Sequence, residues 1–246
     1  MKSALLALGF VLVITLPARA DDTAERAVIA KALKAHHGDV DSAKVAAATI
    51  QIHGKIHAMG MAIPYTGTAF TGGPDRQKVD LEVDVAGMKI RIVNLINGNK
   101  GWAKIDKETK ELDKDQIEDA KHQAYVNWIA TVAPIKGKGF TLSSIGEVMI
   151  EKKPAVGIKV SSKGQRDVDM YFDKTSGLLV KTEARARDEA GKEVTEEIFY
   201  SEFKDVQGTR QPMKFIVHRD GKLYLEADVT EYTLSDKLDD SVFARP

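Results

Sequence analysis

Several stretches of the chain alternate apolar and polar residues with a period of two, which restricts the fold to one built on strands. Residues 79–85, for example, read Val-Asp-Leu-Glu-Val-Asp-Val. Successive side chains of a strand point to opposite faces, so each such run has one apolar face and one face exposed to water. Comparable runs occupy residues 178–185, 213–218 and 223–230. This pattern is typical of antiparallel sheets.

Turn signals separate these runs. Asn97-Gly98 and Asp220-Gly221 each lie between alternating segments, and both dipeptides favour tight hairpin turns. Further turn signals lie at Gly72-Gly73-Pro74, Ala86-Gly87, Lys153-Pro154, residues 173–177 and residues 189–191. Together the runs and turns predict a meander of about ten or eleven strands.

Two segments predict helices. Residues 23–37 are rich in Ala, Lys and Glu, and Gly38 is placed to end the helix. Residues 114–132 carry apolar side chains at spacings of three and four, and Pro134 follows. At 1.5 Å per residue this second helix is roughly 28 Å long, enough to cross a sheet. We therefore predict a mainly β fold with helices, in which a bent antiparallel sheet has an apolar inner face that the two helices can cover.

The first twenty residues have the layout of a secretory signal peptide. Lys2 precedes an uncharged, mostly apolar run over residues 4–16, and Ala18-Arg19-Ala20 forms a small-x-small cleavage signal. The run is shorter than the approximately 20 residues that span a membrane. We expect a signal peptide over residues 1–20, a single domain over residues 21–246 and a location outside the cytoplasm, which in a Gram-negative bacterium is the periplasm.

Composition excludes several classes of protein. Without Lys2 and Arg19 the chain has 34 basic and 36 acidic residues, a net charge of −2, which argues against nucleic acid as a partner. There is no Cys, which excludes thiolate ligands, Cys nucleophiles and disulfides. Since no second long apolar run follows, we expect no integral membrane segment in the mature chain, and we expect a monomer.

Several segments resemble the LolA-like periplasmic carriers, which include the outer-membrane lipoprotein-sorting proteins. The similar segments are residues 97–102, 171–179, 203–212 and 238–246. The resemblance covers most of the mature chain. It implies a curved, unclosed antiparallel β-barrel with a helical lid, which holds acyl chains in an apolar cavity. In the lipoprotein-sorting members, cargo is received from an inner-membrane complex and passed to an outer-membrane acceptor. No lid-locking polar residue of that family matches a position here.

The predicted function is a periplasmic, non-enzymatic carrier or chaperone that binds acyl chains of lipoproteins or lipids. Its partners would be this cargo and the envelope proteins that donate and accept it. The alternative is a periplasmic sensor or protein-interaction module of the envelope on the same fold. An enzyme is not expected, because there is no Gly-x-Ser-x-Gly motif and the acidic clusters fit solvated surfaces.

The residues expected to line the apolar cavity are large, adaptable or aromatic side chains. They are Met59, Met61, Met88, Trp102, Tyr125, Trp128, Ile129, Val132, Phe199, Phe203 and Phe215. Met suits variable apolar cargo, but Met and aromatic residues also fill ordinary cores. Core packing therefore stays open as the alternative to cavity lining for each of these residues.

No cofactor or metal is expected. His53 and His57 lie four residues apart on a predicted strand and so share a face. Zinc sites use three or four converging protein ligands, and the sequence offers no third partner for this pair.

Overall fold

The computed structural model describes residues 23–58, 60–188 and 190–246. The predicted signal peptide and Met59 lie outside these residues. The helices of the described chain are α1 (Thr23–His37), α2 (Lys114–Ala130) and the short 3₁₀ helices η1 (Ser42–Val45), η2 (Ala133–Lys136) and η3 (Asp240–Phe243). The strands are β1 (Ala47–Ala58), β2 (Met61–Thr71), β3 (Arg76–Val85), β4 (Met88–Asn97), β5 (Lys100–Ile105), β6 (Glu108–Glu111), β7 (Phe140–Ile150), β8 (Lys153–Ser162), β9 (Val168–Asp173), β10 (Leu179–Arg187), β11 (Glu193–Ser201), β12 (Lys204–Val206), β13 (Thr209–Gln211), β14 (Lys214–Arg219) and β15 (Lys222–Ser235).

Thirteen of the strands in the described chain form one antiparallel sheet in the order β6-β5-β4-β3-β2-β1-β15-β14-β11-β10-β9-β8-β7. Its edge strands β6 and β7 do not pair, so the sheet is curved but unclosed, as predicted. The number of strands exceeds the predicted ten or eleven. The short strands explain part of the difference, because β6 reads Glu-Thr-Lys-Glu and has no apolar alternation to reveal it. Strands β12 and β13 form a separate hairpin.

Two-residue turns join most neighbouring strands. Ala86-Gly87 and Asp220-Gly221 have positive φ at both positions, as the type I′ turns of hairpins require. The predicted turn at Lys153-Pro154 is displaced by two residues. Glu151 and Lys152 make this turn instead, with φ of 48° and 65°, and Pro154 lies inside β8.

The helices have clear boundaries. α1 spans the predicted residues, and Gly38 ends it with a φ of +53°, its N–H donating to the carbonyl of Lys34 at 3.0 Å. α2 begins with a capping box in which the Asp113 side chain accepts from the backbone N–H of Gln116. It ends at Ala130, two residues before the predicted end. Neither α-helix of the described chain has the length and apolar content needed to cross a membrane.

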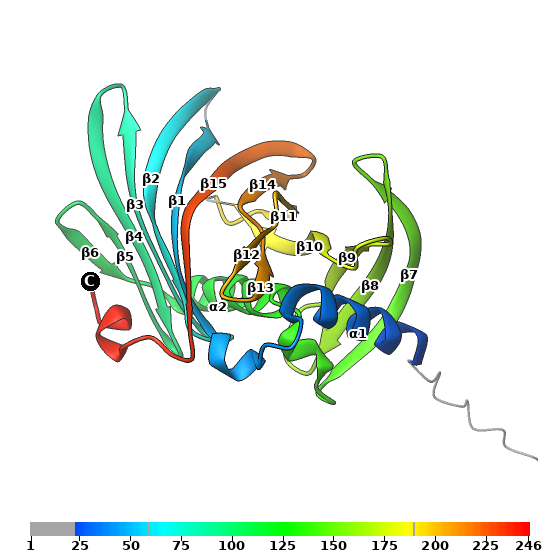
Figure 1. The fold of residues 1–246 in the computed structure, drawn as a ribbon. Helices are drawn as coiled ribbons and strands as arrows, with labels where there is room; N and C mark the ends of the chain where they lie inside the picture. The colour runs from blue at the N-terminus through cyan, green and yellow to red at the C-terminus, as the bar shows by residue number, and fades with distance from the viewer. Residues whose placement is uncertain (1–22, 59, 189) are drawn as a thin grey trace, which may run out of the picture.

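The helices fill only one half of the curved sheet. The sheet curves around α2, which contacts β3, β4 and β5 on one side and β10 on the other (Figure 1). The largest hydrophobic cluster joins α1 and α2 to β7–β11 and includes Ile29, Ile129, Val160 and Phe172, each at most 1 % exposed. A smaller cluster around Tyr65, Val83 and Ala227 belongs to β2, β3 and β15. The inner face of this second half is therefore covered far less completely.

Candidate ligand-binding cavity

A cavity of about 360 Å³ lies between α2 and the less filled half of the sheet. This volume falls at the lower end of the approximately 300–1,000 Å³ that is typical of small-molecule sites. Strands β1, β2, β3, β11, β14 and β15 supply most of its wall, and α2 supplies one side. The cavity therefore lies beside the second helix, where the apolar cavity was predicted.

Strand register explains why the sheet wall is apolar. Ala69 of β2 pairs with Ile50 of β1 and with Val79 of β3, so all three side chains share one face. The same face continues across β15 and β14, where Phe215 pairs with Ala227. The apolar side chains that line the cavity from the sheet are Ile50, Ile52, Ala69, Val79, Leu81, Leu179, Ile198, Phe215, Val217, Leu225 and Ala227.

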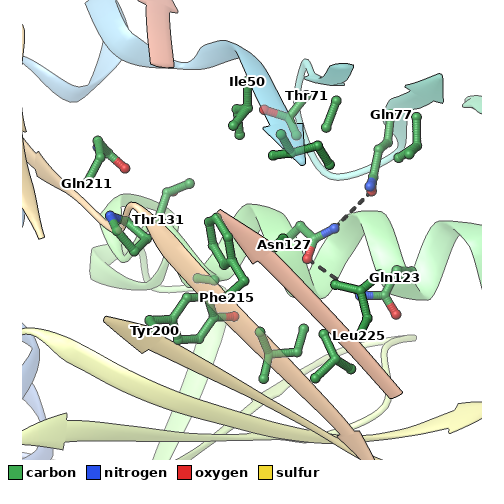
Figure 2. Close-up of a pocket in the computed structure, with 18 of the residues that line it drawn as sticks. Ile50, Thr71, Gln77, Gln123, Asn127, Thr131, Tyr200, Gln211, Phe215 and Leu225 are labelled. Carbon is green, nitrogen blue, oxygen red and sulfur yellow. Dashed lines mark hydrogen bonds between the residues drawn. The ribbon is translucent and has the colours of Figure 1, made fainter. Parts of the chain in front are cut away.

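The wall contributed by α2 is polar. Gln123, Asn127 and Thr131 line the cavity together with Ala130. Asn127 Nδ2 donates to Oε1 of Gln77 on β3 at 3.1 Å, and Gln123 Nε2 approaches Asn127 Oδ1 at 3.5 Å (Figure 2). These amides connect the helix to the sheet across the cavity, and none of them carries a charge.

The charged groups of the cavity neutralise one another. Arg219 Nε donates to Oε2 of Glu196 at 3.0 Å, and the Arg219 guanidinium lies 3.6 Å from the centre of the Tyr224 ring. The hydroxyl of Tyr200 is within 2.9 Å of Thr182 Oγ1, and burial raises its pKa, so this phenol stays neutral. The cavity thus presents apolar surface with neutral or internally paired polar groups.

His36 joins α1 to the cavity wall. Its Nε2 accepts the backbone N–H of Leu179 at 2.9 Å, and its Nδ1 lies 3.2 Å from the carbonyl of Arg210. Because Nε2 accepts, Nδ1 carries the proton and donates to that carbonyl. Burial lowers the pKa of His36 to about 4, so the imidazole is neutral at pH 7. Its ring packs edge-on against Phe203 at 5.7 Å.

Two of the residues predicted to line the cavity do so, namely Phe203 and Phe215. Tyr125, Ile129 and Val132 are instead buried in the filled half, with Trp128 packed against the same cluster. The apolar stripe of α2 therefore faces β7–β11, and the helix turns its polar side to the cavity. The physical reason is that the filled half removes more apolar surface from water than an open cavity does.

The other predicted residues lie elsewhere. Met61 and Met88 are 52 % and 64 % exposed beside hairpin turns. Phe199 alternates with the cavity residues Ile198 and Tyr200, so it lies on the opposite face of β11, where its ring is 5.2 Å from His218.

Trp102 of β5 pairs with Leu95 of β4, and Leu95 pairs with Lys78 of β3, so these three side chains share one face of the sheet. The residues on either side of Lys78 both line the cavity, so their side chains point to the opposite face. This register also places Trp102 on the face away from the cavity. Met59 is outside the described residues. Some cavity residues, such as Ile52 and Val217, were not predicted. They could have been found by taking every second residue of each strand, because alternate side chains share one face.

The two His residues of β1 each lie close to an oxygen atom of β15. His57 Nε2 lies 3.1 Å from Glu226 Oε1, and His53 Nδ1 lies 3.3 Å from the carbonyl of Asp228. Among the described residues no group of three or more His, Cys, Asp or Glu side chains could hold a metal ion.

Comparisons with known proteins show which fold this is. No protein-family model matches the chain, and no curated protein matches it. A LolA superfamily protein from Nitrosomonas europaea matches in structure with a TM-score of 0.53 and 11 % identity, over 89 % of this chain and 96 % of that one. A domain assigned to outer membrane lipoprotein sorting, from Vibrio parahaemolyticus, has a TM-score of 0.55 and 9 % identity over 89 % and 95 %.

A DUF1329 family protein from Desulfovibrio piger matches with a TM-score of 0.56 and 11 % identity, over 90 % of this chain and 96 % of that one. These matches show that the chain has the fold of the LolA superfamily proteins.

Proposed function

We propose that this chain, which shares the LolA-like fold, is a non-enzymatic carrier that binds acyl chains of lipoproteins or lipids in its cavity. The observation that carries the proposal is the hollow half of the sheet, whose inner wall is apolar and faces α2 across about 360 Å³. Lipoprotein sorting is the role assigned to one of the proteins with this fold. We place the chain in the periplasm after removal of residues 1–20.

The chemistry of the cavity suits an acyl chain. Each methylene moved from water into an apolar site contributes about 0.8 kcal/mol, so even a short acyl segment gains several kcal/mol. The apolar wall residues, such as Leu81 and Ile198, form no side-chain hydrogen bonds to a ligand, so they do not fix its orientation. Since Arg219 is paired with Glu196, the ion pair supplies little net charge to attract an ionic ligand.

Filling the cavity tests the proposal. Ala69 lines the cavity on β2, and Thr68 precedes it on the opposite face of the same strand. We expect Ala69→Trp to reduce the affinity for a fluorescent fatty-acyl probe by about tenfold or more, because the indole occupies the space of the ligand. The affinity is measured by titrating the probe with the protein that begins at Asp21.

The matched control is Thr68→Trp, which adds the same side chain outside the cavity and should retain wild-type probe affinity. Equal loss in both variants, or no binding by the wild type, contradicts the carrier. Mass spectrometry of natively purified protein gives a second readout, since a carrier should retain acyl-chain species. A protein that retains none but holds an envelope protein stably would instead be an interaction module.

A further inference from the structure

Exposed apolar side chains gather at one end of the hollow half of the sheet. Five large hydrophobic residues of the described chain are exposed, and all five lie within two residues of a hairpin turn. Four of these turns join neighbouring strands between β6 and β14 in the sheet, and the fifth, beside Met149, joins β7 and β8. We call the residues beside the first four turns the apolar tips: Met61 (β1–β2 hairpin), Met88 (β3–β4), Ile105 (β5–β6) and Leu223 (β14–β15). Each is between 37 % and 64 % exposed.

The order of the strands places the apolar tips along one edge of the cavity-bearing half. The four hairpins occupy eight consecutive strands, from β6 to β14, and alternate turns of an antiparallel sheet fall at the same end. Pairing of Ile56 with Leu225 sets the β14–β15 turn beside the β1–β2 turn. In Figure 1 the β1–β2, β3–β4 and β14–β15 turns lie along the upper edge, and the β5–β6 turn lies at the left.

The inner face between the tips and the cavity is also apolar. Ile56 pairs with Ile63, and Val83 pairs with Ile90, just inside the turns. These residues belong to the same hydrophobic cluster as the cavity residues Leu81 and Leu225. An acyl chain that enters between the tips therefore meets apolar surface all the way to the cavity.

We propose that the apolar tips insert into the surface of a lipid bilayer and place the cavity mouth against it. Separate apolar side chains on neighbouring turns suit insertion between headgroups, whereas protein interfaces favour a contiguous patch with aromatic and Arg anchors. The turn residues 85–88, 105–108 and 219–223 carry three basic and three acidic side chains. Insertion therefore depends on burial of the apolar tips and only weakly on lipid charge. The use of this contact for loading or delivery of cargo rests on the proposed carrier function.

Met149 provides a matched control for the tips. It is 64 % exposed, the same fraction as Met88, but it lies on β7, the edge strand of the filled half. Because the chain has no Cys, Met88→Cys and Met149→Cys can each carry one environment-sensitive fluorophore. The chain from Asp21 is used because the apolar segment 4–16 would itself bind lipid, and because the strands and helices of the described residues begin at Thr23.

Vesicles of phosphatidylcholine and vesicles containing phosphatidylglycerol are added to both labelled proteins. We expect the fluorophore at position 88 to shift to the blue with either lipid, and the fluorophore at position 149 to stay unchanged. In vesicle flotation, the double variant Met88→Ser/Ile105→Ser should bind about tenfold more weakly, and Met149→Ser should bind like the wild type.

No vesicle binding, equal shifts at both positions, or binding only to the anionic vesicles overturns the proposal. A tip-dependent interaction with an envelope protein in the absence of lipid also overturns it, in favour of a protein partner. Probe binding in solution, without vesicles, is measured on the same variants. It should be unchanged, so that failure of membrane docking is distinguished from failure of the carrier function.

Discussion

At the scale of single residues, His36 is the group whose ionisation most directly concerns both fold and cavity. Its neutral ring accepts a backbone N–H from Leu179 and donates to the carbonyl of Arg210, and it is only 5 % exposed. Protonation would remove the acceptor and leave a buried charge beside the cavity. The sequence revealed only that a His pair ends the first helix, because its partners are more than 140 residues away in the chain.

We expect the stability of the protein to fall as the pH is lowered from 7 to 5. The pKa of His36 is about 4 in the folded chain and near 6.5 when unfolded, so the unfolded state binds more protons between these values. The contribution of His36 is complete above pH 6.5 and declines as the pH falls toward 4, by about 2 kcal/mol between pH 7 and 5. Urea denaturation at both pH values measures the change.

The variant His36→Gln is the control for this prediction. It removes the titrating ring, so its stability should be lower than that of the wild type at pH 7 but should change less with pH. A variant with the same pH dependence as the wild type would show that other groups cause the effect.

At the scale of elements, α2 serves two environments with two faces. Ile129 is fully buried in the cluster with β7–β11, while Asn127 faces the cavity and reaches Gln77 of β3. The sequence predicted the helix and its apolar stripe, but not its capping residues. It could not predict which part of the sheet the stripe would contact, because both halves offer an apolar inner face.

Substitutions on the two faces of α2 should have different effects. Ile129→Ala should lower the free energy of unfolding by about 2–5 kcal/mol, since it opens a cavity in a packed core. Asn127→Leu should cost only about 1–2 kcal/mol, because it breaks two hydrogen bonds at a half-buried site, one of them long at 3.5 Å, but it should change the affinity for the acyl probe. Chemical denaturation and probe titration of both variants give the comparison. If Ile129→Ala altered probe affinity at unchanged stability, its place in the core would be contradicted.

At the scale of the whole molecule, one continuous sheet has a filled half and a hollow half. α1 and α2 pack on β7–β11, and β1–β3 with β11, β14 and β15 line most of the cavity. A sheet of uniform apolar pattern is thus divided by where its two helices lie. The filled half contains the largest packed core, and the hollow half contains the cavity.

Amide hydrogen exchange should report this division. Backbone amides of β8–β10 should exchange more slowly than those of β2–β4, because opening of the filled half exposes more packed apolar surface. Saturation with an acyl probe should slow exchange in β2 and β3 and leave β8 and β9 unchanged. Uniform protection in both halves, or a ligand effect confined to β8 and β9, would contradict the assignment of the cavity.

The sequence by itself determined the antiparallel strands, the sites of most turns, the helix over residues 23–37 and the start of the helix at Lys114. These features depend on neighbours within a few residues, through alternation, turn conformation and the spacing of apolar side chains along a helix. Only the tertiary structure decided that Phe203 and Phe215 line the cavity while Trp128 and Ile129 do not. That choice depends on how strands and helices distant in the chain pack together, and the same apolar residue satisfies the local pattern in a core or in a cavity wall.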